Sequence, residues 1–199
     1  MVSRTSQDKD SEYIANLPSK EQKIIKEFVE KVDPKGKRSL NVLLRFLYIA
    51  KLNQERAEEL IHIFDDLWAK VDAEASDDEV LRELKTGKYL KGKTDSKGRG
   101  VMQCICKLHV PADFEIPVMI KTTLMVMDMV LSDIETVKGG LVWLAWMEGS
   151  GWNNFNLGLQ KEFSGLFKVF GDAALDLMGE LNIVDGPWWC TLALTLCKP

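Results

Sequence analysis

The stretch that decides the fold is GGLVWLAWMEGSGWNNF, residues 139–155. Two glycines precede a run of seven apolar residues, 141–147, which includes two tryptophans and ends before Glu148. A strand with one solvated face alternates apolar and polar residues, whereas a strand covered on both faces in a parallel sheet is an almost unbroken apolar run. The stretch therefore predicts a central strand over residues 140–147.

The residues after this strand place it in a parallel pair. Asn153 or Asn154 can cap a helix that reaches Phe170, and a further strand is expected near residues 181–185. A strand, a helix and a second strand at this spacing form a βαβ unit, whose two strands are parallel neighbours.

The residues before it predict two further strands and a helix. Strands are expected over 88–91 and 101–108, separated by the turn sequence TDSKGRG (94–100). A methionine-rich helix is expected from Pro117 to about Leu131, since proline suits the first turn of a helix. The predicted fold class is α/β, with a mixed, largely parallel sheet and flanking helices.

The N-terminal part of the chain predicts helices without strands. Helices are expected over 19–32, 40–47, 54–71 and 76–86. The first and the last begin with capping boxes, Ser19 with Gln22 and Ser76 with Glu79, and Asn53 can cap the third. Apolar residues recur three and four positions apart in the second and third. Residues 1–18 are polar and are expected to form a disordered tail. The predicted domains are therefore a helical N-terminal subdomain over 19–86 and the sheet domain over 87–199.

Composition and charge exclude several classes of protein. The chain of 199 residues is 46% hydrophobic and 28% charged, which is typical of a globular protein, and its net charge of -4 gives no general attraction to nucleic acid. No signal peptide is evident, and the longest apolar runs are shorter than the roughly 20 residues that span a bilayer. We expect a cytoplasmic protein with no nucleic-acid partner.

The sequence contains no catalytic constellation. His62 and His109 are the only histidines, and Glu148 has no second carboxylate beside it. Neither pair of cysteines has the spacing of zinc ligands, which predicts free thiols in a reducing compartment. The cysteines are Cys104, Cys106, Cys190 and Cys197. We expect no enzymatic activity and no metal.

One motif match has the wrong surroundings. GKYLKGKT, residues 87–94, fits the phosphate-loop pattern G-x-x-x-x-G-K-[ST]. That mechanism needs a strand before the loop and a helix after it, so that the helix N-terminus faces the phosphates. Here a helix is expected before the loop and a turn after it, so we interpret the match as a coincidence.

The same stretch is strongly basic, and two interpretations stay open. It is either a solvated hairpin or a docking patch for an anionic membrane, to which each basic side chain contributes about 1 kcal/mol. The candidate docking residues are Lys88, Lys91, Lys93, Lys97 and Arg99.

Two apolar segments fit either a protein core or a ligand pocket. Four methionines lie on the helix predicted after Pro117, and methionine packs in cores but also lines adaptable pockets. The segment DGPWWCTLALTLCKP, residues 185–199, predicts a helix that is apolar nearly all round. Such a helix packs inward, meets a partner or touches lipid.

Four segments, in this order, resemble the CRAL-TRIO family of lipid-binding domains. They are SLNVLLRFLYIAKLNQERAEELI (39–61), LKTGKYLKGKTDSKGRGVMQCICKLHVP (84–111), KGGLVWLAWMEGSGWNNF (138–155) and LNIVDGPWWCTLALTLCKP (181–199). Asp95, Gly98 and Arg99 match the D-x-x-G-R turn of the family. Within the family, the similarity is greatest to the N-terminal domain of a non-receptor tyrosine phosphatase.

The resemblance implies a cavity that encloses one hydrophobic lipid, such as a phospholipid, between the sheet and a helical gate. It implies no cofactor other than this bound lipid. The implied cavity floor comprises Leu141, Trp143, Ala145, Met147 and Ile183. The implied gate residues are Trp188, Trp189, Leu192 and Leu196. The implied function is lipid sensing, lipid transfer or membrane targeting, peripherally on internal membranes or vesicles.

Departures from the family pattern qualify the expected ligand and the expected extent of the domain. Residues 169–180 lack the arginine and lysine usual there, which argues against a phosphoinositide ligand. Family domains continue beyond the equivalent of residues 197–199, so a truncated CRAL-TRIO domain is expected. The alternative function is a regulatory or interaction domain of a larger signalling enzyme, such as a protein tyrosine phosphatase.

Overall fold

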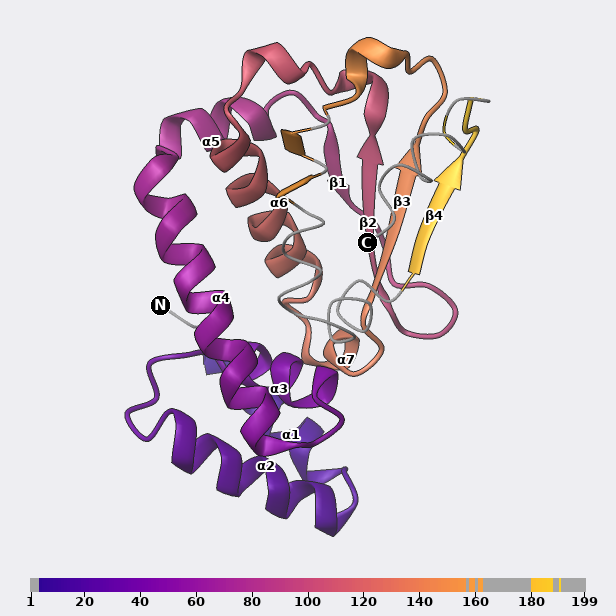
Figure 1. Cartoon of the computed structure of the whole chain (residues 1–199). Coiled ribbons are helices and arrows are strands. Elements are labelled where there is room, and N and C mark those ends of the chain that lie inside the picture. Colours follow the sequence, from indigo (N-terminus) through magenta and orange to yellow (C-terminus); the bar gives the residue numbers. More distant parts are fainter. Residues whose placement is uncertain (1–3, 157, 160, 163–179, 188–189, 191–199) are drawn as a thin grey trace.

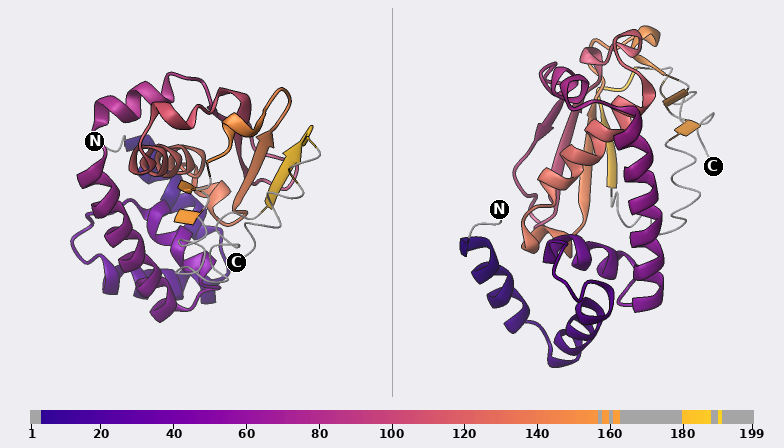
Figure 2. Two further views of the ribbon diagram at one scale, coloured as in Figure 1. Left: turned by 45° about the horizontal axis from the view of Figure 1, so that its top comes forward. Right: turned by 90° about the vertical axis from the view of Figure 1, so that its left-hand side faces the viewer.

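The computed structural model describes residues 4–156, 158–159, 161–162, 180–187 and 190. Within them, a helical unit lies at one end of the molecule and a sheet with its covering helix at the other (Figure 1). The longest helix of the helical unit extends from it alongside the helix that covers the sheet, as both views in Figure 2 show. The predicted order of a helical subdomain followed by an α/β unit is therefore observed.

From Arg4 onwards, five helices precede the first strand. They are α1 (Arg4–Ala15), α2 (Ser19–Val32), α3 (Leu40–Ile49), α4 (Gln54–Glu74) and α5 (Asp77–Leu84). The expectation of a disordered tail over 1–18 is wrong for α1. This helix is polar, but near its end Tyr13 and Ile14 pack against the core of the helical unit, as does Leu17 just beyond it.

In the part of the chain that the structure describes, four strands form one sheet in the order β1-β2-β3-β4. They are β1 (Tyr89–Lys91), β2 (Gly100–Ile105), β3 (Leu141–Trp146) and β4 (Glu180–Val184). The pair β1–β2 is antiparallel, whereas β2–β3 and β3–β4 are parallel. The predicted α/β fold with a mixed, largely parallel sheet is thus confirmed.

The second strand ends earlier than expected. After Ile105 the chain forms two short 3-10 helices, η1 (Cys106–Leu108) and η2 (Pro111–Asp113), where the sequence suggested strand up to residue 108. A third, η3 (Trp152–Asn154), stands where a longer helix was expected to begin. Most of that expected helix lies outside the described residues.

Of the described helices, α6 (Ile116–Val130) covers one face of the sheet (Figure 1). It lies between β2 and β3 in the chain and is followed by the short α7 (Ile134–Val137). Side chains of α6 form a common core with Met102 of β2 and Leu141 of β3. The hydroxyl groups of Tyr89 on β1 and Thr123 on α6 are 2.8 Å apart. This contact fixes the helix across the sheet.

Candidate functional site

The apolar run 141–147 forms β3, and its alternate side chains lie on the face of the sheet that α6 covers. The register pairs Trp143 with Leu181 and Ala145 with Ile183. Paired residues of parallel strands point to the same side. Leu141, Trp143, Ala145 and Ile183 therefore lie on one face, together with Leu181, and we call these five residues the apolar sheet face.

Burial decreases across this face from β2 towards β4. Met102 of β2 has no exposed surface, whereas Trp143, its neighbour on β3, is half-buried. Leu141, at the start of β3, also has no exposed surface and packs in the core beneath α6. On β4, Leu181 is 47% exposed and Ile183 is 36% exposed. An apolar ligand therefore has more room at the β4 end than at Leu141, which is a core residue.

Leu181 was missed in the sequence analysis. The sequence does contain the pattern that indicates Leu181 as a site residue. Leu181 and Ile183 are two residues apart on a predicted strand, so their side chains must point to the same side of the sheet. The register with Trp143 is the evidence that adds it to the apolar sheet face.

Met147 lies at the end of the same run, beside the start of the C-terminal segment. Its backbone N–H donates to the carbonyl oxygen of Val184, at 2.9 Å. Its side chain packs with Phe155 against Cys190, which is buried. The expected gate residues Trp188, Trp189, Leu192 and Leu196 lie outside the described residues.

The basic hairpin is less uniform than the sequence suggested. Lys88 is only 2% exposed and forms an ion pair with the fully buried Glu83, so its place in a docking patch is a wrong prediction. Its ammonium group also lies 3.2 Å from Nδ1 of His109 and 4.8 Å from the centre of the Tyr89 ring. These partners come from outside the hairpin turn, so the basic sequence pattern alone does not reveal the burial.

The remaining basic residues of the hairpin differ in how they are held. Lys91 is exposed and donates to the carbonyl oxygen of Met129, at 2.7 Å. Lys93 and Lys97 are exposed. The exposed basic residues of the hairpin are therefore Lys91, Lys93 and Lys97.

Arg99 is committed to two carboxylates. Its guanidinium lies 2.7 Å from Asp95 and 2.6 Å from Glu180 at the start of β4. The Arg99 backbone N–H and guanidinium hold the pKa of the Asp95 carboxyl below its ordinary value, and the guanidinium likewise lowers the pKa of Glu180. Arg99 therefore joins the hairpin turn to β4.

The buried polar residues near Lys88 show no catalytic geometry. Burial, and to a lesser extent the charge of Lys88, lowers the pKa of His109 to about 4. His109 Nε2 is buried and has no hydrogen-bond partner in the described part of the chain. A neutral histidine held next to an ammonium group is suited to structural packing, because it is not positioned to exchange protons with a substrate in solution.

The phosphate-loop match does not have the geometry of a phosphate loop. Its residues 89–91 form β1, and the turn before β2 follows them.

The described residues can also be compared with the patterns of metal sites and membrane-spanning helices. Among the described residues, no group of three or more His, Cys, Asp or Glu side chains could hold a metal ion. Within the same residues, no helix has the length and apolar character needed to cross a bilayer. Cys104, Cys106 and Cys190 are free thiols.

Comparison with known proteins agrees with this geometry. The chain is 27% identical over 183 residues to tyrosine-protein phosphatase non-receptor type 9 of Mus musculus, Rattus norvegicus and Homo sapiens. The matched region covers 87% of this chain but only 30% of each relative, so the chain spans about a third of their length.

The family comparison covers the whole sheet unit. Residues 84–199 match the family model for the CRAL/TRIO domain, more than half of the chain. Domains of this kind bind lipids and other small hydrophobic molecules and are not catalytic. The earlier resemblance is therefore confirmed, and the chain belongs to the CRAL/TRIO family.

Proposed function

We propose that the chain holds one lipid, a phospholipid or a similarly apolar molecule, against the apolar sheet face and Met147. The observation that carries this proposal is the exposure of Leu181 and Ile183 beside the half-buried Trp143. Large apolar side chains that remain open to solvent next to a core mark a surface to be covered. The proposed covering segment contains Trp188, Trp189, Leu192 and Leu196.

The energetic reason for such a site is the cost of carrying acyl chains through water. Each methylene removed from water contributes about 0.8 kcal/mol, so enclosing one acyl chain contributes on the order of 10 kcal/mol. This free energy favours a closed site over a surface groove. We therefore propose lipid sensing, lipid transfer or membrane targeting as the biological role, with the protein peripheral on internal membranes and otherwise cytoplasmic.

The proposal is tested by mass spectrometry of organic extracts of the purified chain. We expect one lipid class to co-purify, and we expect Ile183→Asp and Trp143→Asp to lose it, because a carboxylate on this face is costly to bury beside an acyl chain. Trp146→Asp is the matched control. Trp146 is on the same strand, points to the opposite face and is 42% exposed, so this variant should keep its lipid.

Two results would contradict the proposal. One is a clean extract from a folded, monomeric wild-type chain. The other is equal lipid content in Ile183→Asp and Trp146→Asp, when circular dichroism shows that both are folded. Ile183 is already partly exposed, so its replacement should leave the fold intact.

The alternative of a regulatory domain of a larger signalling enzyme is not favoured. The match to a phosphatase lies within 30% of the length of that enzyme, and the family model matched is that of a ligand-binding domain. A lipid-binding role accounts for the apolar sheet face, which a purely regulatory role does not require.

A further inference from the structure

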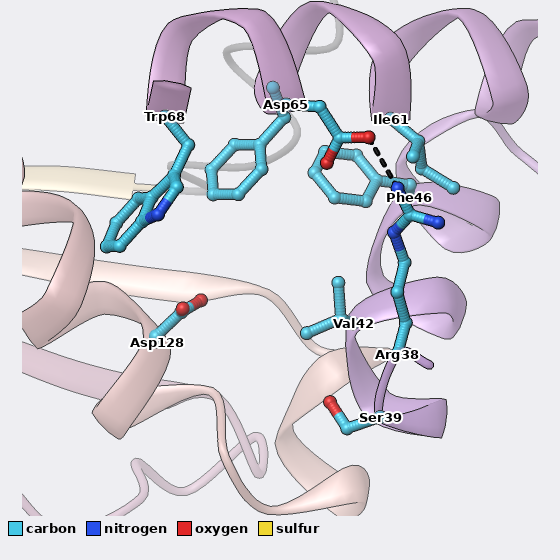
Figure 3. Close-up of a pocket in the computed structure, with 9 residues that line it drawn as sticks. Arg38, Ser39, Val42, Phe46, Ile61, Asp65, Trp68 and Asp128 are labelled. Carbon is cyan, nitrogen blue, oxygen red and sulfur yellow. Dashed lines mark hydrogen bonds and ion pairs between the residues drawn. The ribbon is translucent and has the colours of Figure 1, made fainter. Parts of the chain in front are cut away.

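The cavity between α3, α4 and α6 offers no unpaired charge to a ligand. Its volume is about 210 Å³, and Figure 3 shows Asp65 and Asp128 among the residues that line it. Asp65 pairs with Arg38 at 2.5 Å, and Asp128 pairs with the buried Arg45, also at 2.5 Å. Two nucleophilic side chains lie elsewhere, where β2 ends.

These side chains are two cysteines on either side of Ile105, the last residue of β2. Cys104 is within the strand, where the register places it opposite Tyr89 of β1 and Ala145 of β3, and it is only 9% exposed. Cys106 begins the 3-10 helix η1 and is partly exposed. One cysteine of the pair is therefore buried in the sheet, whereas the other is open to solvent in part.

The turn of the chain from β2 into η1 brings the two cysteines into contact. The thiol of Cys106 donates to the carbonyl oxygen of Cys104, and its Sγ lies 3.7 Å from that oxygen. The thiol of Cys104 in turn donates a hydrogen bond to the sulfur of Cys106 when Cys106 is ionised. The two thiol groups are therefore direct neighbours.

The surroundings favour the thiolate form of Cys106. The hydrogen bond from the Cys104 thiol is the main cause that lowers the pKa of Cys106 below its ordinary value. The Lys88 ammonium group, although it pairs with Glu83, adds a smaller effect in the same direction, and burial opposes both. The hydrogen bond and burial raise the pKa of Cys104. Because the thiolate is the nucleophilic form of cysteine, Cys106 is the thiol that should react first.

We propose that Cys106 and Cys104 form an oxidation site for hydroperoxides, in which Cys106 is the attacking thiol and Cys104 the resolving thiol. In the first step, the Cys106 thiolate attacks the terminal peroxide oxygen. An S–O bond forms, the O–O bond breaks, and an alkoxide leaves, or hydroxide if the oxidant is hydrogen peroxide. The peroxide is thereby reduced, and Cys106 is oxidised to a sulfenic acid.

The second step joins the two cysteines. The sulfur of Cys104 attacks the sulfur of Cys106, an S–S bond forms, and the S–O bond breaks. The departing hydroxide takes the proton of the Cys104 thiol and leaves as water. In sum, two thiols and one hydroperoxide give one disulfide, one water and one alcohol, or a second water from hydrogen peroxide. Exchange with a thiol reductant reverses the modification.

Peptide mapping of the full chain tests the proposal, because trypsin leaves both cysteines on one peptide. Cleavage after Arg99 and Lys107 releases GVMQCICK, residues 100–107, whereas Cys190 follows Lys168 on another peptide. The reduced chain is treated with hydrogen peroxide, then denatured and labelled with N-ethylmaleimide. We expect residues 100–107 to lose two hydrogen atoms and to carry no maleimide. Dithiothreitol before labelling should restore both labels.

Two results of the mapping would overturn the proposal. One is full maleimide labelling of both cysteines in residues 100–107 after peroxide treatment. The other is a disulfide that links this peptide to the peptide with Cys190, since Cys104 would then not be the resolving thiol.

Variants assign the two roles. Cys106→Ser should abolish the mass loss. In Cys104→Ser, the sulfenic acid of Cys106 should persist and be trapped by dimedone, and its absence in the folded variant would overturn the assignment of Cys106. Cys190→Ser is the matched control, because it removes a buried thiol that packs against Met147 and Phe155, and it should form the disulfide as the wild-type chain does.

The rate of alkylation tests the reactivity of Cys106 without any substitution. In the folded, reduced wild-type chain, iodoacetamide should modify Cys106 at least fivefold faster than Cys104 or Cys190. Equal rates at the three positions would overturn the assignment of Cys106 as the attacking thiol. This measurement also decides the assignment if Cys104→Ser does not fold.

Discussion

Lys88 shows at the scale of a residue why a charged sequence pattern does not predict exposure. It lies among basic residues of a hairpin, yet it is buried against Glu83, and its ammonium group contacts His109. A lysine is buried where a carboxylate from another element is placed to pair with it. Glu83 comes from the end of α5 and His109 from the loop beyond β2, so their meeting depends on the assembled fold.

His109 gives a prediction for the dependence of stability on pH. Its pKa is lowered to about 4 from an ordinary value of 6.5, so the unfolded chain binds more protons between these two values. The free energy of unfolding should therefore fall as the pH falls from 6.5 to 4, by about 3 kcal/mol from this group.

Urea unfolding at pH 7 and at pH 4.5 measures this effect. In His109→Gln the decrease in the free energy of unfolding between the two pH values should be clearly smaller than in the wild-type chain, because glutamine does not titrate. The same loss in His109→Gln and in the wild-type chain would show that carboxylates alone cause it.

At the scale of the elements, local signals predicted most of the architecture. The unbroken apolar run 141–147 became β3, which ends one residue earlier at Trp146. The expected capping of α4 by Asn53 and of α5 by Ser76 is observed, because both side chains accept bonds from backbone N–H groups within three residues. An apolar run and a helix cap each depend on residues close together in the chain, so both can be recognised from the sequence alone.

Other elements were missed because their stability is not local. Helix α1 is polar and short of apolar periodicity, and it is secured by Tyr13 and Ile14 packing against the helical core. The cavity between α3, α4 and α6 was also not foreseen. It brings together Phe46, Trp68 and Asp128, which are far apart in the sequence and share no motif.

The hairpin between β1 and β2 supports a prediction about membrane docking. Lys93 and Lys97 are exposed, whereas Lys88 is buried and Arg99 is held by Asp95 and Glu180. Lys93→Glu combined with Lys97→Glu should weaken binding to phosphatidylserine vesicles at least tenfold at low salt, since each basic side chain contributes about 1 kcal/mol.

Co-sedimentation with vesicles measures this change. The control is Lys26→Glu combined with Lys70→Glu, which changes the net charge equally at exposed positions in α2 and α4. If both double variants lose the same affinity, net charge decides the binding and the hairpin is not the docking patch.

At the scale of the whole molecule, polar contacts join the helical unit to the sheet unit. Lys121 of α6 is buried, and its ammonium group lies 2.7 Å from Asp72 and 2.9 Å from Asp77. The buried Arg45 of α3 pairs with Asp128 on the same helix, α6. Helix α6 therefore contacts both units, and we expect them to unfold together.

The Arg45–Asp128 pair provides a test of this coupling. Asp128→Ala should lower the free energy of unfolding by on the order of 2 kcal/mol, because it leaves a buried guanidinium without its counter-charge. Arg45→Met combined with Asp128→Ala should recover much of this loss. Urea unfolding followed by far-ultraviolet circular dichroism is the measurement, and full stability of Asp128→Ala would refute the coupling.

Strand β1 has a consequence for how separate molecules meet. Among the described strands it is the edge of the sheet next to β2 (Figure 1). It comprises only three residues, of which Leu90 and Lys91 are exposed. An edge this short offers few backbone groups to a strand from another molecule, and a lysine on it disfavours such pairing. Edge-to-edge pairing of two molecules through β1 is therefore disfavoured.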